Sequence, residues 1–137
     1  MNTSTKIRPT KFMPIISIFG FVAVSGLVNA HHSAVAFDLD KPLVQSSGKV
    51  ISFIWRSPHT SINLEVTNEA GEKEIWKWEG AGTVALVRSG VTRETIKPGQ
   101  TLSVTGNPLR DASPGGLMRS IQLDDGRVID FGQAATQ

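Results

Sequence analysis

The chain alternates apolar and polar residues in short runs, and this period of two residues restricts its fold more than any other feature. The run SINLEVT (61–67) shows it best, with Ile62, Leu64 and Val66 on one side and polar residues on the other. Successive side chains of a β-strand point to opposite faces, so the run predicts a strand with one buried face. The predicted core comprises Ile62, Leu64, Val66, Leu102 and Val104.

Other strand-length runs follow the same logic and are separated by turn signals. They are GKVISFIW (48–55), EIWKWEG (74–80), TLSVTG (101–106), GLMRSIQL (116–123) and VIDF (128–131). The connections NEAGEK (68–73) and DDGR (124–127) predict hairpins. In the first run, apolar residues occupy both faces, Ile51, Phe53 and Trp55 on one and Val50 and Ile54 on the other. We therefore expect that strand to be largely buried.

One segment, TVALVRSG (83–90), predicts a short helix, with Thr83 as its N-cap and Gly90 as its C-terminal stop. Three strands, a short helix, two more strands and a terminal extension are the element order of an OB-fold. We predict an all-β protein with one short helix, built as a small OB-fold-like barrel of five to six strands. A simple five-stranded sandwich is the alternative.

The first 30 residues have the order of a secretory signal peptide. Lys6, Arg8 and Lys11 precede an apolar stretch (12–28), and Val28 and Ala30 fit the small-residue rule for cleavage. We expect cleavage after Ala30 and a periplasmic mature protein; an uncleaved membrane anchor is the alternative. The chain then divides into a signal peptide (1–30), an extended arm (31–42), an OB-like barrel domain (43–132) and a disordered tail (133–137).

The charge of the mature chain argues against nucleic acid as a partner. Three of the 14 basic residues and none of the 12 acidic ones precede His31, which leaves 11 basic groups against 12 acidic ones. Phosphate binding needs an excess of positive charge, so we expect no nucleic-acid partner. We also expect no membrane partner once the leader is removed, because no other stretch of the chain is apolar enough to span a bilayer. There are no cysteines, so the fold must be stable without disulfides.

Cleavage after Ala30 would give His31 a free α-amino group next to its own imidazole. Together they can chelate a metal ion near neutral pH, and copper(II) is the divalent ion that such nitrogen ligands favour. His32 can add a third nitrogen, and His59 can close the site if the arm folds back. The alternatives are an incidental chelator at a flexible end for the histidine pair and a turn-stabilising hydrogen bond for His59.

Two further groups of residues are candidate ligand contacts. Trp55, Trp76 and Trp78 can form a stacking platform, because OB-folds bind on their second and third strands, or can pack in the core. Arg110 and Arg119 bound the loop RDASPGGLMR and are candidate anion contacts.

No arrangement of Ser, His and Asp in a recognisable catalytic context is present, so we expect a binding module and not an enzyme. The alternative is an interaction protein that holds an envelope partner or small ligand, without metal, on its open face and the loop from Asn107 to Gly116. Copper-based oxidative catalysis is the least favoured hypothesis.

The segments HHS, FDLDKP, GKVISFIWRSPHTSINLEV and WKWEGAG resemble a family of small exported proteins of unknown function, over residues 31–131. The resemblance implies an OB-like fold, a mature chain that begins at or beside His-His-Ser, and a first strand that ends in an Asn-Pro-His turn. The chain departs from that pattern at Ser57, where Asn is usual, and at Gly80-Ala81-Gly82, where a longer or more polar link is more frequent. The first change weakens a side-chain cap on the turn.

The leader can be tested directly on exported protein. We predict that its intact mass corresponds to a chain beginning at His31, because the small residues at 28 and 30 define the cleavage site. A start at any other residue would remove the chelating amine and contradict the copper hypothesis.

Overall fold

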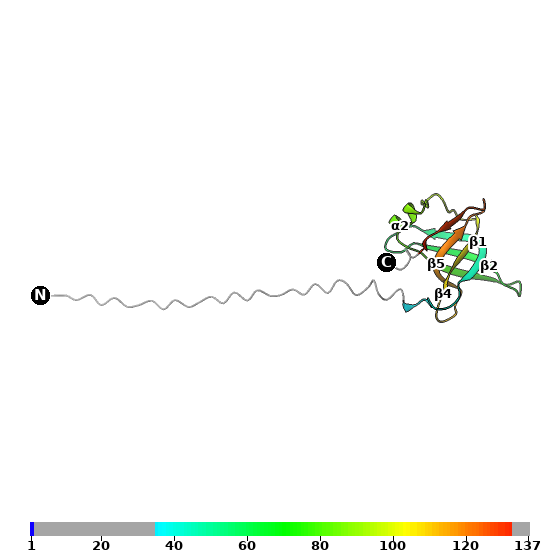
Figure 1. Cartoon of the computed structure of the whole chain (residues 1–137), viewed down its shortest axis with the longest axis horizontal. Helices are drawn as coiled ribbons and strands as arrows, with labels where there is room; N and C mark the ends of the chain where they lie inside the picture. The colour runs from blue at the N-terminus through cyan, green and yellow to red at the C-terminus, as the bar shows by residue number, and fades with distance from the viewer. Residues whose placement is uncertain (2–34, 133–137) are drawn as a thin grey trace.

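In the computed structural model, which describes residue 1 and residues 35–132, the described part of the chain forms six strands and one short helix (Figure 1). They are β1 (Val44–Ile54), β2 (Ser61–Thr67), β3 (Lys73–Glu79), α2 (Thr83–Arg88), β4 (Thr101–Pro108), β5 (Gly115–Gln122) and β6 (Val128–Asp130). Residues 2–30 of the predicted signal peptide, His31, His32 and the predicted tail (133–137) lie outside the described residues.

The strands form a closed barrel. Neighbouring strands pair in the antiparallel order β3-β2-β1-β4-β5-β6, and a parallel pairing of β3 with β5 closes the barrel, from Lys77 opposite Gly115 to Glu79 opposite Leu117. β6 extends this five-stranded barrel as the hairpin partner of β5. The predicted all-β, OB-like fold is therefore confirmed.

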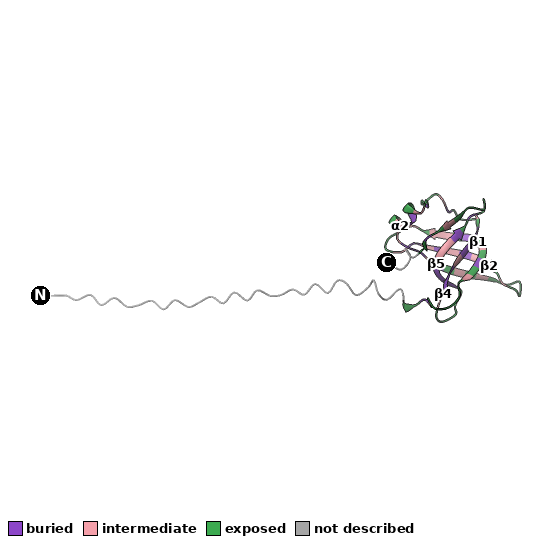
Figure 2. Ribbon diagram, in the orientation of Figure 1, coloured by how far each residue is buried: buried purple, intermediate pink, exposed green. Residues whose placement is uncertain are grey.

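The inner faces of the strands form one hydrophobic core (Figure 2). Ile62, Leu64, Leu102 and Val104 are at most 1 % exposed, as the sequence predicts, whereas Val66 is only partly buried and packs against the core from outside it. The α2 helix adds its single buried side chain, Leu86. Within residues 35–132, no helix has the length and apolar character needed to cross a bilayer.

Trp78 of β3 fills the barrel where β3 meets β5. Its side chain is fully buried, and its indole N–H donates to Ser46 Oγ at 2.9 Å. A Cβ atom at Gly106 or Gly116 would come within 2.7 or 3.0 Å of the Trp78 ring and would also overlap the backbone of the facing strand. Glycine is therefore needed at both positions, because the facing strand and the ring together leave no room for a side chain.

Two local predictions were wrong. Ile51 and Ile54 are 45 % and 40 % exposed, because β1 has a bulge between Val50 and Ser52 that adds Ile51 to the strand without a partner on β2. The bulge lets Val50 and Phe53 both contact the core although they are three residues apart. Thr83 is not the N-cap of the helix.

The N-cap position of α2 belongs to Gly82, which makes no side-chain cap hydrogen bond. Gly90, with φ of +84°, follows the end of the helix, and the predicted stop is confirmed.

We predict that Leu64→Ala lowers the free energy of unfolding by about 2 to 5 kcal/mol, because the fully buried side chain leaves a cavity. Urea denaturation of the mature chain measures this. Leu43→Ala is the matched control, since Leu43 is 52 % exposed and should change stability little. Equal losses for the two variants would contradict the assignment of the core face.

Candidate functional site

The turn between β1 and β2, which carries His59, is fixed to the link between β3 and α2. Thr60 is fully buried, and both its hydroxyl and its backbone N–H donate to the Ala81 carbonyl oxygen, at 2.8 and 3.2 Å. In return, the backbone N–H of Gly80 donates to the Thr60 carbonyl oxygen at 2.8 Å. His59 is therefore held by its neighbour in sequence and is not on a free loop.

The link approaches the turn so closely that it has no room for side chains at two positions. A Cβ atom at Gly80 would lie 2.8 Å from Thr60 Oγ1, and one at Gly82 would lie 2.8 Å from the Pro58 carbonyl oxygen. Ser57 Oγ also lies 3.0 Å from Thr83 Oγ1. Ser57 and the Gly-Ala-Gly link, the two places where the sequence departs from the resembled pattern, thus lie against each other.

His59 faces an acidic residue of β3. Its Nδ1 lies 3.3 Å from Glu79 Oε1, and neither atom is reached by solvent or has a hydrogen-bond partner among the described residues. The His59 side chain is nevertheless 36 % exposed, so solvent reaches the side-chain atoms other than Nδ1. A carboxylate beside one imidazole nitrogen orients the ring and leaves the other nitrogen, Nε2, for a ligand.

An open groove of about 440 Å³ follows the outer face of β2 and β3 and ends at Glu79. Its polar lining comes from two cross-strand pairs, Ser61 with Glu79 and Asn63 with Lys77. Its other walls include Ile54, Ala36, Phe37 and Leu109. The strand 2–3 face is where OB-folds bind their ligands, so the groove occupies the position at which a ligand is expected.

The arm is docked along this groove. Phe37 is 4 % exposed and packs against Leu109 and Leu117, apart from the main core. The backbone N–H of residue 38 donates to the Pro108 carbonyl oxygen at 2.9 Å, and that of Arg110 donates to the Ala36 carbonyl oxygen at 3.0 Å. The chain that precedes the barrel is therefore attached to it from residue 35 onward.

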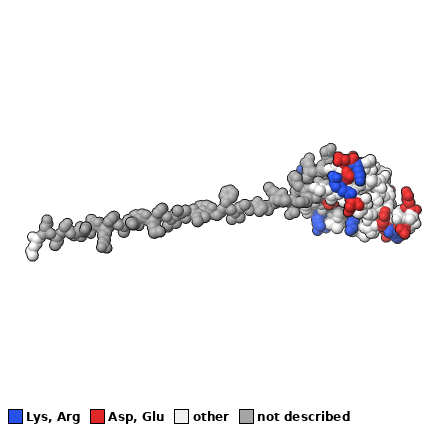
Figure 3. All heavy atoms as spheres, turned by 90° about the horizontal axis from the view of Figure 1, so that it is seen from below, with Lys and Arg blue, Asp and Glu red and all other residues white. Residues whose placement is uncertain are grey.

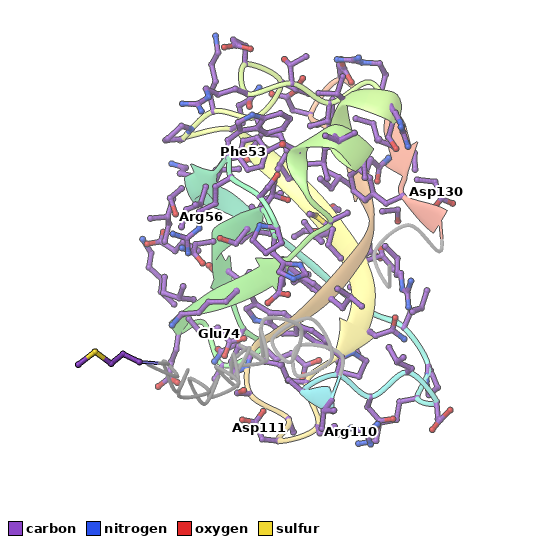
Figure 4. All side chains as sticks on the ribbon, turned by 90° about the vertical axis from the view of Figure 1, so that its left-hand side faces the viewer. Phe53, Arg56, Glu74, Arg110, Asp111 and Asp130 are labelled. Carbon is purple, nitrogen blue, oxygen red and sulfur yellow. The ribbon has the colours of Figure 1, made fainter. Side chains whose placement is uncertain are left out.

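Both predicted arginines make contacts within the protein. Arg110 Nε donates to the Val35 carbonyl oxygen at 3.0 Å, so this side chain helps to hold the arm. Arg119 Nε donates to Oδ1 of the buried Asn107 at 2.6 Å, and its Nη1 donates to the Gly132 carbonyl oxygen at 3.3 Å. Arg110 lies at the end of the barrel opposite Phe53 (Figure 4).

The three tryptophans are divided between two places. Trp76 and Trp78 stack with ring centroids 5.8 Å apart, Trp78 fully buried and Trp76 partly buried against the core. Trp55 lies apart and contacts the edge of Phe53, with centroids 5.5 Å apart.

Two carboxylates have a lowered pKa, and both lie in exposed turns outside the groove lining. The hydroxyl and amide of Ser113 hold the pKa of Asp111 below its ordinary value, because both donate to the charged form. The amide and guanidinium of Arg127 do the same to the pKa of Asp125. These are local turn interactions, and neither carboxylate is suited to proton transfer at neutral pH.

Sequence reasoning missed two residues of this site, Phe37 and Glu79. The hairpin register places Glu79 opposite Ser61, two residues after His59, so a strict pairing of the predicted strands would have found it. Phe37 gave no such signal, because FDLDKP has no strand or helix period. Within residues 35–132, no three His, Asp or Glu side chains come together as a metal site.

The sequence matches the model of a family described as a family of unknown function, DUF6152, over residues 20–119. No curated protein matches it. Among solved structures, the chain is similar to the crystal structure of a small single-stranded DNA-binding protein from Streptomyces coelicolor. The two share 20 % sequence identity and a TM-score of 0.46, over 66 % of this chain and 98 % of that one.

We predict that Thr60→Val lowers the free energy of unfolding by about 1 kcal/mol, because it removes the buried hydroxyl bond to Ala81 while it keeps the shape of the side chain. Thermal or urea unfolding measures the change. Thr67→Val, at the exposed end of β2, is the matched control and should be nearly neutral. A neutral result for Thr60→Val would mean that the His59 turn is not held in this way.

Proposed function

We propose that this chain, which belongs to the DUF6152 family, is an exported, periplasmic OB-like binding module that binds copper(II) where its mature N-terminus meets the groove. The proposed role is binding and not catalysis. Nucleic acid is not among the proposed ligands, because the mature chain has one more acidic than basic group.

The observation that carries the proposal is the docking of the arm. A histidine pair on a free chain end would be an incidental chelator, but the chain is attached to the barrel at Val35, four residues after His31. An extended residue spans about 3.3 to 3.6 Å, so the mature N-terminus stays within about 14 Å of Val35. Ala36 and Phe37 line the same groove as Glu79, the partner of His59.

The donor set suits copper(II). The α-amino group and imidazole of His31 form a chelate ring, His32 offers another imidazole, and His59 offers Nε2. Glu79 would keep the His59 ring oriented, as carboxylates beside metal-binding histidines do.

The second candidate is a small-ligand or envelope-protein binding module without metal. The groove itself favours it, because Lys77 lies there without an ion-pair partner among the described residues. In that case the groove would bind its ligand equally well with and without copper, and His59 would only stabilise its turn.

We predict that the mature chain binds one copper(II), more weakly as the pH falls through the imidazole range because protons compete for the ligands. His59→Ala should lower the affinity about tenfold, or about 1.4 kcal/mol, in a calorimetric titration, without lowering the melting temperature of the apo protein. One alanine added before His31 should cause at least as large a loss, because it turns the amine into an amide. If His59→Ala lowers the melting temperature and leaves copper affinity unchanged, His59 is a turn anchor.

The arm gives an independent test. We predict that Phe37→Ala, which removes the buried anchor, weakens copper binding about as much as His59→Ala. The two losses should not add in the double variant, because each uncouples the N-terminus from His59. Leu39→Ala is the control on the same arm, since Leu39 is 43 % exposed. Unchanged copper affinity in Phe37→Ala would show that the docked arm has no part in the site.

A further inference from the structure

The outer side of α2 is an apolar surface that no part of residues 35–132 covers. Val84 and Val87 are 63 % and 56 % exposed, and a hollow of about 390 Å³ separates the helix from Trp55. Thr83 and Arg88 complete its lining. We call these five residues the α2 surface. It lies with Phe53 at the end of the barrel away from Arg110 and the docked arm (Figure 4).

Trp55 differs from the other two tryptophans in its hydrogen bonding. The indole N–H groups of Trp76 and Trp78 donate to side-chain oxygens at 2.7 and 2.9 Å, whereas that of Trp55 has no partner among the described residues. Trp55 is only partly buried, at the edge of the core. An aromatic ring with an apolar body and a free donor is typical of a boundary between an apolar and a polar phase.

Two arginines without ion-pair partners in the described part of the chain lie at the α2 surface. Arg88 is part of the lining of the hollow, Arg56 follows Trp55 in the sequence, and neither forms an ion pair within residues 35–132. Figure 3 shows the molecule from below the view of Figure 1, and the face seen there carries acidic and basic side chains close together. The lining of the α2 surface therefore carries a positive charge and no carboxylate.

We propose that the α2 surface docks the mature protein reversibly on a membrane surface that contains anionic phospholipid. Val84 and Val87 would enter the acyl boundary, the Trp55 indole would lie at headgroup level, and Arg56 and Arg88 would contact lipid phosphates. Exposed aliphatic side chains next to Arg88 and Arg56 match the apolar interior and the negative charge of such a lipid surface. This inference revises the expectation that the mature chain has no membrane partner, and it does not depend on copper.

The test is co-sedimentation of the chain from His31 to Gln137 with vesicles of phosphatidylcholine, alone or mixed with an equal amount of phosphatidylglycerol. Residues 35–132 contain the complete barrel core, so this chain retains the fold. We expect binding to the mixed vesicles and little binding to the neutral ones. The Val84→Ser/Val87→Ser double variant should weaken it about tenfold, since both valines lose their apolar contact. Arg88→Gln should weaken it in the mixed vesicles alone.

Matched controls lie outside the α2 surface. Val128→Ser removes an equally exposed valine, 65 % exposed, from β6, and Lys49→Gln removes an exposed cation from β1. Both should leave binding unchanged, and melting temperatures should confirm that every variant is folded. No sedimentation with mixed vesicles, equal binding to neutral vesicles, or unchanged binding of the double variant would overturn the proposal. The first of these results would leave a protein partner as the occupant of the surface.

Discussion

The closure of the barrel around Trp78 is the constraint on which the rest of the structure depends. Gly106 and Gly116 let β4 and β5 approach each other closely and leave room for the indole ring, and Gly115, with φ of +139°, lets β5 begin against Lys77 of β3. This pairing brings the start of β5, and with it the loop after β4, next to the outer face of β3. The loop after β4 forms part of the groove lining and makes the backbone hydrogen bonds that hold the arm, so both features depend on this pairing.

The candidate site combines three segments that are far apart in the sequence. Phe37 fixes the arm and Thr60 fixes the turn. The pairing of β2 with β3 forms the outer face between them and places Glu79 beside His59. None of these contacts belongs to the main core alone, so each can be removed while the barrel persists. That separation makes the site testable by single substitutions. The α2 surface adjoins the turn of this site, where Thr83 contacts Ser57, and lies away from Arg110 and the docked arm (Figure 4).

Strand alternation and the one helical segment were sufficient to predict the barrel, and Ile62 and Leu64 lie where their period placed them. Ile51 does not, because a bulge depends on how two strands pair and leaves no mark on the periodicity of either. Thr83 has the right residue type for an N-cap, but Gly82 takes that position because the link packs tightly on Pro58. The role of Phe37 depends on a long-range contact with Leu109, which no local pattern encodes.

The central claim is that the docked arm brings the mature N-terminus to the groove beside His59. Copper(II) is paramagnetic, so the amide resonances of an isotope-labelled mature chain report directly where it is bound. On addition of one equivalent, the account predicts selective broadening of Ala36, Ser61 and Glu79, with the β2–β3 turn (68–72) and β6 unaffected. Broadening confined to the residues before Phe37 would contradict it, because the histidine pair would then bind copper away from the barrel.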